Sequence, residues 1–476
     1  MADGGFLIRT CRNQNMEIQR KIFVQVPSYR DRQLIPTLTD LVENASDPGG
    51  LRIVVCWQHD SDESLDDFID SGFRHSGSTR SNGHLVHLLD KDGAIVEVID
   101  VHFLDTKGCG WARNASQGHY DGERYNLQID AHHRFVEHWD AAMIDMLESL
   151  RGRYEKPLLT GYPPSFDPAV FPEGRQNHVG QMLVRKFSTL GIVSYRAARM
   201  PGWEERTEPM RARFMSGGFV FSDGRFVEEV MNDAEHFFST EEIVMAVRAF
   251  THGYDFFHPH RPLLWHQYNS GARKVWDDHT DERKSSGEIE GSATDRAILA
   301  LERSLSLLGI SEDHEAVDFG RYGLGRHRSV EQFERYAGLS FRHRGIRREA
   351  AEPTEPDESC YDLPVNEWED GLICKRAFRV CISNTQPLPE SADLDSVVVA
   401  AYAADGSELV ARSLSATELE VLAALGSFEY IEKFEACPSR LPAQYDLQAT
   451  SKSPELSGAF SIMVHELGED AVSVAL

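Results

Sequence analysis

The sequence predicts an α/β fold: a largely parallel, Rossmann-like sheet covered by helices, followed by a smaller, mainly β C-terminal domain. Three observations support this fold class. Apolar runs that end in polar residues alternate with helical periodicity over the first half of the chain. The segment 349–370 is rich in acids, lacks Lys and Arg, and so has the composition of a solvated linker. Beyond it, short β-type runs dominate.

The first half of the chain repeats the strand, loop, helix and strand order of a parallel sheet. The apolar run 22–26 is followed by Leu34, Leu38 and Leu41 at helical spacing, and then by a second buried run at 51–57. Later segments repeat this alternation. We expect further strands at 96–103, 125–129 and 157–162, and a helix at 136–150.

The second half is less regular. Pro, Gly and Arg interrupt the pattern from 163 to 215, where we expect long loops over the ligand-binding face. Asp405-Gly406 indicates a hairpin turn in the C-terminal part. We expect a strand at 214–221, helices at 241–250, 293–308 and 330–337, and C-terminal strands at 378–383, 396–403, 408–413 and 458–465. The predicted domains are 1–348, the linker 349–370, and an accessory domain at 371–476.

Composition excludes several classes of function. The formal net charge of -27 argues against nucleic acid or an anionic membrane as the main partner. The seven cysteines include no CxxC pair and are typical of reduced thiols. No stretch approaches the roughly 20 apolar residues of a membrane span, and the N-terminus has no apolar core of a signal peptide. We therefore expect a soluble, cytoplasmic protein of unknown oligomeric state.

The most informative stretch is YNLQIDAHHRF at 125–135, in which an apolar run ends at Asp130 and His132. Alternation along an extended chain places both side chains on one face, with only Ala131 between them. A carboxylate oxygen and an imidazole nitrogen together suit a divalent ion such as Mn²⁺, and ligands bind at strand ends of open α/β sheets. The alternative is a capped loop or a satisfied polar pair.

Three further groups accompany this pair. Pro27, Ser28, Tyr29 and Arg30 close the first strand, where a nucleotide base and ribose would lie. The segment GCGWARN at 108–114 begins a helix whose Arg113 carries a planar donor fork suited to a diphosphate. Late histidines complete the set, and one of them could join the metal site: His258, His260 and His266.

In this order, the motifs resemble those of the GT-A glycosyltransferases, and within them the cytoplasmic polypeptide α-N-acetylglucosaminyltransferases. QIDAHHRF is similar to that family's IDSH-x-RF metal strand, with Ala131 where Ser is usual. SGGFVF, with Gly217 and Gly218, is similar to its acceptor-side strand. The segment FSTEE at 238–242 resembles its GEE helix, with Ser-Thr replacing glycine. The resemblance spans roughly 22–344 and leaves out the C-terminal domain.

The resemblance implies a UDP-GlcNAc donor, a divalent metal (Mn²⁺, or Mg²⁺) and a hydroxyl acceptor on a protein or glycan, with the anomeric configuration retained. The metal ligands it implies are Asp130, His132 and His266, with His258 and His260 as the other choices for the third ligand. Glu241 and Glu242 would contact sugar hydroxyls or the acceptor as catalytic residues. The implied donor-binding residues are Pro27, Ser28, Tyr29, Arg30, Asp60, Arg113 and Asp130, and the implied acceptor-side residues are Trp203, Gly217 and Gly218.

Each of these residues also has a purely structural interpretation. Arg113 could form an ion pair, Arg30 could pair with Asp31, and Trp203 could anchor loop packing. An acidic pair such as Glu241-Glu242 is favourable in the first turn of any helix.

Three other functions compete. The same chemistry could act on a glycan or a small molecule, or the chain could bind a sugar nucleotide without turnover. A His-rich metal hydrolase is the candidate from another class, although a motif such as HExxH is absent.

Overall fold

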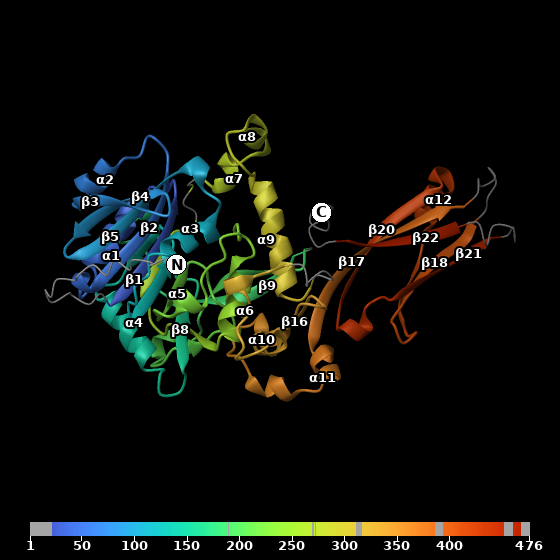
Figure 1. The fold of residues 1–476 in the computed structure, drawn as a ribbon. Helices are drawn as coiled ribbons and strands as arrows, with labels where there is room; N and C mark the ends of the chain where they lie inside the picture. Colours follow the sequence, from blue (N-terminus) through green and yellow to red (C-terminus); the bar gives the residue numbers. More distant parts are fainter. Residues whose placement is uncertain are drawn as a thin grey trace, which may run out of the picture.

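The expected α/β class is confirmed by the structure, a computed structural model. A large mixed sheet with covering helices is followed by smaller C-terminal sheets (Figure 1). No helix among the described residues combines the length and the apolar run that crossing a membrane requires. The described residues are 21–188, 190–268, 271, 273–310, 317–385, 394–451 and 460–467.

The main sheet has ten strands, in the order β11-β13-β8-β12-β6-β1-β2-β5-β4-β3. Its centre is parallel: β1 pairs with both β2 and β6, and β2 pairs with β5. The strand β12 runs antiparallel between β6 and β8. The bounds are β1 Ile22–Tyr29, β2 Leu51–His59, β3 Arg74–Ser81, β4 His84–Lys91, β5 Ala94–His102, β6 Tyr125–Ile129, β8 Lys156–Thr160, β11 Met210–Arg211, β12 Phe219–Asp223 and β13 Tyr254–His258.

Alternation along the strands divides the apolar side chains between two faces of this sheet. On β1, Val24 packs into the larger core cluster, which also holds apolar side chains of α1 and α4, whereas Phe23 packs against α3 on the opposite face. The pattern Leu34, Leu38, Leu41 is the buried side of α1, as its spacing predicts. The helix bounds are α1 Leu34–Glu43, α2 Leu65–Asp70, α3 Cys109–Gln117, α4 Trp139–Glu148 and α5 Phe226–Glu229.

A second core lies under the later helices. Apolar residues of α6 and α10 pack there with β9 and β12. The segment 163–215, expected to be loops throughout, contains the antiparallel ribbon of β9 and β10, and Met182 and Val184 of β9 pack into this second core. The bounds are α6 Glu241–Thr251, α7 Val275–Asp278, α8 Asp281–Ser286, α9 Ala293–Leu307, α10 Val330–Ala337, β9 Gly180–Phe187 and β10 Val193–Arg199.

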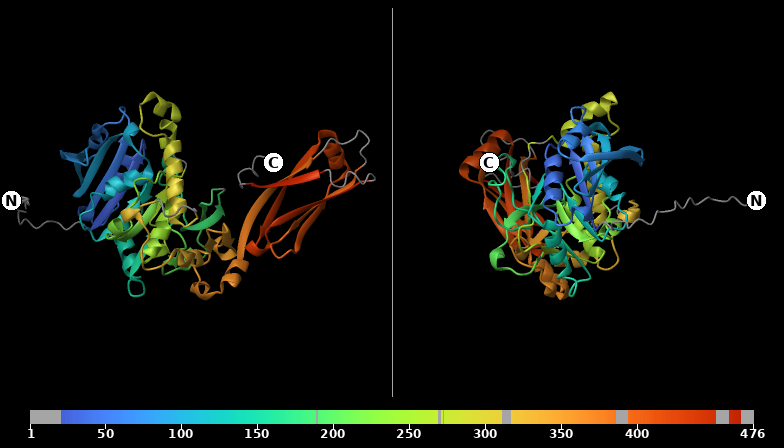
Figure 2. Two further views of the ribbon diagram at one scale, coloured as in Figure 1. Left: turned by 45° about the vertical axis from the view of Figure 1, so that its right-hand side comes forward. Right: turned by 90° about the vertical axis from the view of Figure 1, so that its left-hand side faces the viewer.

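The C-terminal strands stand apart from the main sheet in Figure 1 and in the left view of Figure 2. Their two sheets enclose a separate core of Val380, Ile382, Val397 and Val399 among others. The short strand β16 (Gly345–Arg347) pairs with β17, and this pairing joins the two parts of the chain. The other bounds are β15 Leu339–Ser340, α11 Val365–Asp370, β17 Leu372–Asn384, β18 Leu394–Tyr402, β19 Glu408–Ser413, α12 Ala416–Leu425, β20 Ser427–Ala436, β21 Gln444–Ser451 and β22 Phe460–Leu467.

The domain boundaries at 348 and 370 remain predictions. The structure shows which contacts hold the acidic segment between them. Cys360 and Trp368 are buried. Arg206 pairs with Glu355, and the Arg335 guanidinium donates to the carbonyl of Cys360. The segment is therefore packed against the first part of the chain. The first two residues of the expected strand 458–465 lie outside the described residues.

Candidate active site

The candidate site lies where the central parallel strands end. The strand β1 runs between β2, which follows it in the chain, and β6, which comes later, so the strand order reverses at β1. Such a reversal opens a crevice at the carboxyl ends of the strands. A cavity of about 290 Å³ occupies this place. Its lining includes Pro27, Tyr29, Asp31, Gln58, Gly108, Cys109, Asp130, Ala131, His132, Phe238, His266, Tyr268, Arg273, Lys274, Val275 and Trp276.

Asp130 follows the last residue of β6 and is held from behind by a buried guanidinium. Arg113, on α3, is 2 % exposed and contacts Oδ1 of Asp130 at 2.9 Å. Burial acts to raise the pKa of Asp130, but the hydrogen bond from His266 and the charges of Arg113 and His132 outweigh it. The pKa of Asp130 is therefore held well below its usual value, and the carboxylate is ionised at neutral pH.

His132 is oriented by a second carboxylate. Its Nδ1 lies 2.7 Å from Oδ2 of Asp31, which is the second residue after the end of β1. When Nδ1–H donates to Asp31, the lone pair of Nε2 is free to bind a ligand, which is the usual way that proteins orient a metal-binding imidazole. Burial acts to lower the pKa of His132, but the hydrogen bond to Asp31 and the charge of Asp130 raise it above its usual value.

His266 reaches the site through a small antiparallel ribbon. The strand β14 (Leu264–His266) pairs with β7 (His133–Phe135), which places His266 opposite His133. Nε2 of His266 then lies 3.4 Å from Oδ2 of Asp130. One ligand atom from each of Asp130, His132 and His266 lies within 4.8 Å of the others.

This donor set fits a divalent cation, because one carboxylate oxygen and two imidazole nitrogens converge on the same cavity. The other late histidines lie elsewhere. His258 is buried with Nδ1 at 2.9 Å from the carbonyl of Thr160, and His260 follows β13 outside the cavity lining. Of the three late histidines, the structure thus brings His266 to Asp130 and His132.

The rest of the loop after β1 forms an ion-pair network. Arg30 contacts Asp60 at 2.7 Å and Asp278 at 3.1 Å, so its partner is not the neighbouring Asp31. The hydroxyl of Tyr29 donates to Asp278 at 2.8 Å. This network ties the ends of β1 and β2 to α7. Two other predicted donor-binding residues lie within β1: Pro27 lines the cavity, and Ser28 is buried.

Gly217 and Gly218 let two carboxylates approach the backbone. A Cβ on Gly218 would lie 2.7 Å from Oδ2 of Asp130, and one on Gly217 would lie 3.2 Å from Oε2 of Glu241. Gly218 is therefore required by close packing, whereas a Cβ at Gly217 would need Glu241 to shift by a few tenths of an ångström.

Glu241 and Glu242, in the first turn of α6, contact different residues. Glu241 is buried and contacts Arg113 at 3.2 Å. Glu242 accepts hydrogen bonds from the hydroxyl of Tyr162 at 2.6 Å and the backbone N–H of Gly217 at 3.0 Å. Burial raises the pKa of Glu242 to about 7. Among the described residues that line the cavity, neither carboxylate is present.

Trp203 packs in the ribbon region and not against the cavity. Its side chain lies on a small apolar cluster of Val179, Met200 and Met210. The sequence allowed two roles for Trp203, acceptor contact or loop packing, and its position is that of a residue that anchors a loop.

Comparison with known proteins now decides the family. A family model described as a GlcNAc glycosyltransferase matches residues 21–343, which is more than half of the chain. The chain belongs to this glycosyltransferase family. The resemblance seen in the motifs is confirmed at this level, and the narrower likeness to the polypeptide α-N-acetylglucosaminyltransferases stays a prediction. No curated protein sequence matches the chain significantly.

Several solved structures are similar to this glycosyltransferase at low sequence identity. A structure of GalNAc-T7 with UDP, GalNAc and Mn²⁺ is 13% identical, with a TM-score of 0.41 over 62% of this chain and 49% of that chain. The chain thus spans about half the length of GalNAc-T7. TarS 1–349 from S. aureus is 13% identical, with a TM-score of 0.32 over 60% and 72% of the two chains.

A third similar structure is glucosyl-3-phosphoglycerate synthase from Mycobacterium tuberculosis in complex with Mn²⁺, UDP and glucosyl-3-phosphoglycerate. It is 12% identical to this glycosyltransferase, with a TM-score of 0.29 over 64% of this chain and 88% of that chain.

Sequence reasoning missed three residues of this cavity, and it named Asp31 only as a partner for Arg30. Asp31, Lys274 and the aromatic pair Phe238 and Trp276 all line the cavity. The two rings lie 5.2 Å apart and are 50% and 42% exposed. Exposed aromatic side chains beside a cavity are a signal of ligand contact, but single exposed aromatics cannot be recognised before the fold places them.

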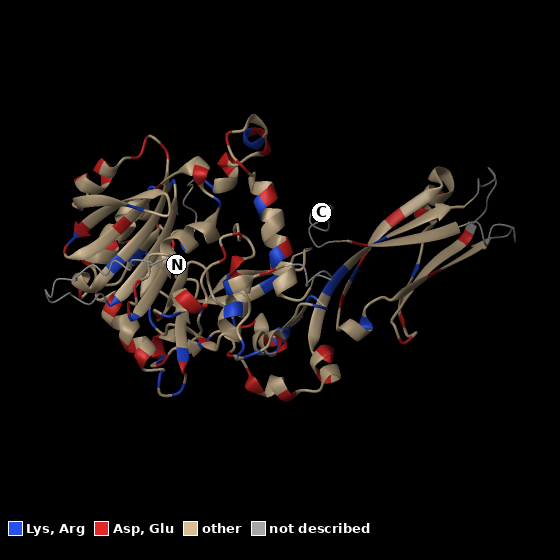
Figure 3. Cartoon of the chain, in the orientation of Figure 1, with Lys and Arg blue, Asp and Glu red and all other residues tan. Residues whose placement is uncertain are grey.

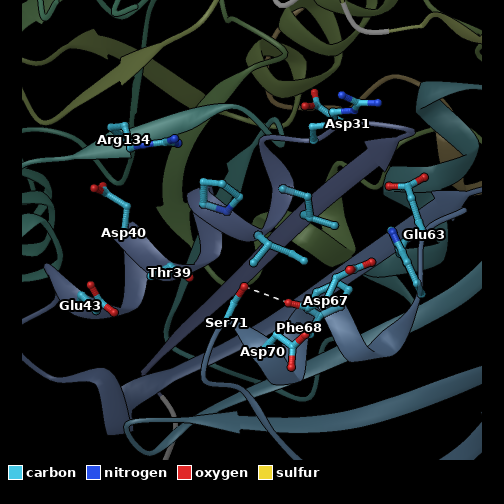
Figure 4. Close-up of a pocket in the computed structure, with 15 residues that line it drawn as sticks. Asp31, Thr39, Asp40, Glu43, Glu63, Asp67, Phe68, Asp70, Ser71 and Arg134 are labelled. Carbon is cyan, nitrogen blue, oxygen red and sulfur yellow. Dashed lines mark hydrogen bonds between the residues drawn. The ribbon is translucent and has the colours of Figure 1, made fainter. Parts of the chain in front are cut away.

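A larger cavity, of about 790 Å³, lies beside the site between α1 and α2 (Figure 4). Asp31 lies at one end of it, away from Glu43 and Asp70. Six carboxylates and two Arg line it, so its electrostatics oppose a diphosphate. The convergent ligand atoms of Asp130, His132 and His266 face the smaller cavity instead.

Proposed function

We propose that this glycosyltransferase transfers GlcNAc from UDP-GlcNAc to a hydroxyl group of a protein (Thr, Ser or hydroxyproline), with a divalent metal, Mn²⁺ or Mg²⁺, and with retention at the anomeric carbon. The observation that carries the proposal is the convergence of Asp130, His132 and His266 at the strand ends of a chain that belongs to the GlcNAc glycosyltransferase family. Family membership decides against the metal hydrolase.

Asp130, His132 and His266 would hold the metal. When bound, a divalent cation supplies positive charge against a diphosphate leaving group. The residues around it are ready for this role. Asp130 is already ionised, and the hydrogen bond between Asp31 and Nδ1 fixes the orientation of the His132 ring. In the solved structures of GalNAc-T7 and glucosyl-3-phosphoglycerate synthase, Mn²⁺ and UDP are present together.

We assign Arg113 to the support of the site. Its guanidinium lies beneath Asp130 and Glu241 and is buried, whereas the cavity is lined by Arg273 and Lys274. Arg273 contacts Asp278 at 2.7 Å. Lys274 is exposed and lines the cavity, so it is the cation we place beside the diphosphate.

The partners of the acids at the cavity support a same-face transfer, without a covalent intermediate, for the proposed retention. The carboxylates that line it are those of Asp31 and Asp130. Asp31 is engaged by His132, and Asp130 by Arg113 and His266. Neither is available to form a glycosyl-enzyme bond. The bond from the anomeric carbon to the phosphate oxygen would break, the acceptor oxygen would bond on the same face, and its proton would pass to the leaving diphosphate.

The test measures UDP release from UDP-GlcNAc with and without Mn²⁺, for the wild type and for Asp130→Ala. Asp70→Ala is the matched control, because Asp70 is an exposed carboxylate of the neighbouring cavity. We expect release that requires Mn²⁺, a loss of at least about 100-fold in Asp130→Ala, and no change in the control. Metal-independent release would reject the proposal, and UDP-GlcNAc binding without release would favour a silent binder.

The sugar and the acceptor are tested separately. A thermal-shift screen of UDP-sugars with Mn²⁺ should show the largest stabilisation with UDP-GlcNAc, because a bound donor stabilises the fold by mass action. Mass spectrometry of candidate proteins after reaction should find an added hexosamine on Thr, Ser or hydroxyproline. Modification of a free glycan alone would replace the protein acceptor by a carbohydrate.

A further inference from the structure

A strongly basic groove lies away from the donor cavity, where β16 joins β17. Its volume is about 770 Å³. In Figure 3, Lys and Arg gather along the part of β17 nearest to β16. We call it the basic groove, and its lining is Arg185, Lys186, Phe187, Arg344, Ile346, Arg347, Arg348, Ala351, Glu352, Ile373, Lys375, Arg376, Ala377, Lys433, Phe434 and Glu435.

The charge of this groove is opposite to that of the whole chain. Eight Lys and Arg residues line it against two Glu, whereas the chain has a formal net charge of -27. Several of these cations are not neutralised by neighbours. Within the part of the chain that the structure describes, no ion pair is formed by Arg185, Arg344, Arg348 or Lys433. A concave surface with such an excess attracts anions locally against an unfavourable global field.

The backbone holds these side chains in place. Arg344 adopts a φ of 49°, in the left-handed region, which is uncommon for a residue other than glycine. On β17 and β20, Lys375 lies opposite Glu435 and Ala377 lies opposite Lys433, so alternate residues of two paired strands face the groove. The groove is therefore built on a sheet and not on loops alone.

The lining of the groove also includes apolar side chains. Phe187, Ile346, Ile373 and Phe434 stand among its cations. A phosphodiester or sulfated chain offers negative charge but few apolar groups to such a surface. A polypeptide segment with Asp or Glu interspersed with apolar side chains matches both features.

We propose that the basic groove docks an acidic, partly apolar segment of the polypeptide acceptor. This inference rests on the proposed function, in which the acceptor is a protein. The ribbon strand β9 links the groove to the transfer site: Phe187 lines the groove, and Gly180 at the other end is packed against the backbone of Tyr162. The ring of Tyr162 in turn packs edge-to-face against the ring of Tyr268, which lines the donor cavity.

The length of β9 sets the spacing of the two sites. Seven steps of roughly 3.3 Å separate Gly180 from Phe187, or roughly 23 Å. The docking segment should therefore lie about seven or more residues of extended chain from the modified hydroxyl. Docking at such a distance would raise the local concentration of the acceptor hydroxyl at the site.

The test uses a fluorescein-labelled peptide of about 12 residues in which Glu alternates with Leu and Phe, and measures anisotropy at about 50 and 300 mM NaCl. The variant is Arg185→Glu with Arg348→Glu. The matched control is Arg80→Glu with Arg326→Glu, which reverses two exposed charges elsewhere. Should the variant not fold, Lys433→Glu replaces it.

We expect the wild type and the control to bind alike, the variant to bind at least about tenfold more weakly, and binding to weaken in high salt. A polyglutamate peptide of equal length should bind more weakly than the mixed peptide. Equal binding by the variant, or no binding by the wild type, would overturn the inference. Tighter binding of a single-stranded oligonucleotide of equal charge would also overturn it, by pointing to a polyphosphate chain.

Acceptor-independent UDP release is measured on the same samples. It should be equal in the wild type and the groove variant, because the substituted residues lie outside the donor cavity. Lost release in both proteins would refute the proposed function, whereas intact release without peptide binding would refute the groove alone.

Discussion

Replacement of Asp31 by Asn tests whether a carboxylate that is not itself a proposed metal ligand controls the affinity of the site for the metal. Asp31 is 8% exposed, and its Oδ2 lies 2.7 Å from Nδ1 of His132. Asn keeps the size of the side chain but loses the charge, and its amide can turn an N–H toward the imidazole. The ring of His132 then loses the partner that fixes its tautomer and orientation.

The expected loss in Mn²⁺ affinity is about 10- to 100-fold, or roughly 1.4 to 2.7 kcal/mol, the usual effect of removing such a partner. The pH dependence gives a second signature. Asp31 raises the pKa of His132, so a proton competes with the metal as the pH falls. Asp31→Asn lowers this pKa. Its affinity should therefore be weaker than that of the wild type at pH 8, with a smaller gap at pH 6.

Isothermal titration calorimetry with Mn²⁺ at both pH values measures the two effects. Asp70→Asn is the control, since it removes a carboxylate from the neighbouring acidic cavity (Figure 4), and in the described part of the chain Asp70 forms no hydrogen bond or ion pair with His132. It should bind Mn²⁺ as the wild type does. If Asp31→Asn also binds Mn²⁺ like the wild type at both pH values, then His132 is not oriented by Asp31 and the reasoning fails.

Three other predictions concern the same region. Gly218→Ala should weaken Mn²⁺ binding at least about tenfold with the fold intact by circular dichroism, because its Cβ would lie 2.7 Å from a carboxylate that Arg113 holds; Gly217→Ala, at 3.2 Å from Glu241, should do less. Trp276→Ala should raise the KM for UDP-GlcNAc several-fold and leave kcat nearly unchanged in steady-state assays; an unchanged KM would remove it from the donor site. For Glu242, burial raises the pKa from 4.5 to about 7. The stability that its protonation contributes is therefore fully present below pH 4.5 and is lost as the pH rises through 7. Glu242→Gln should flatten the decline in melting temperature over this window, and a parallel decline would contradict the assignment.

The local half of the site could be predicted from the sequence. Asp130 and His132 are two positions apart at the end of an apolar run, so strand periodicity alone places them at the same sheet edge. The glycine pair was also visible as a motif. Its physical reason, the close approach of Asp130 and Glu241 to the backbone, required the coordinates.

The remainder depends on contacts between distant segments. His132 and Asp31 are 101 positions apart, and no periodicity connects them. The same holds for Arg30, whose partners Asp60 and Asp278 replace the adjacent acid that the sequence suggested. In the same way, the strands β9 and β10 could not be predicted. They lie in a segment interrupted by Pro and Gly, and a two-stranded ribbon needs only a few apolar residues.

The third ligand shows why folding and metal binding would be coupled here. His266 and Asp130 are 136 positions apart, and the ribbon of β7 and β14 that joins them pairs only three residues on each side. So short a pairing contributes little stability by itself. It is supported by Phe135 and Leu264 in the main core and by hydrogen bonds from His266 N–H to Pro164 and from Gln267 N–H to His132. Because the ligands close this loop only in the folded chain, a cation bound by all three would stabilise the ribbon directly, and any change that weakens the ribbon should weaken the metal site with it.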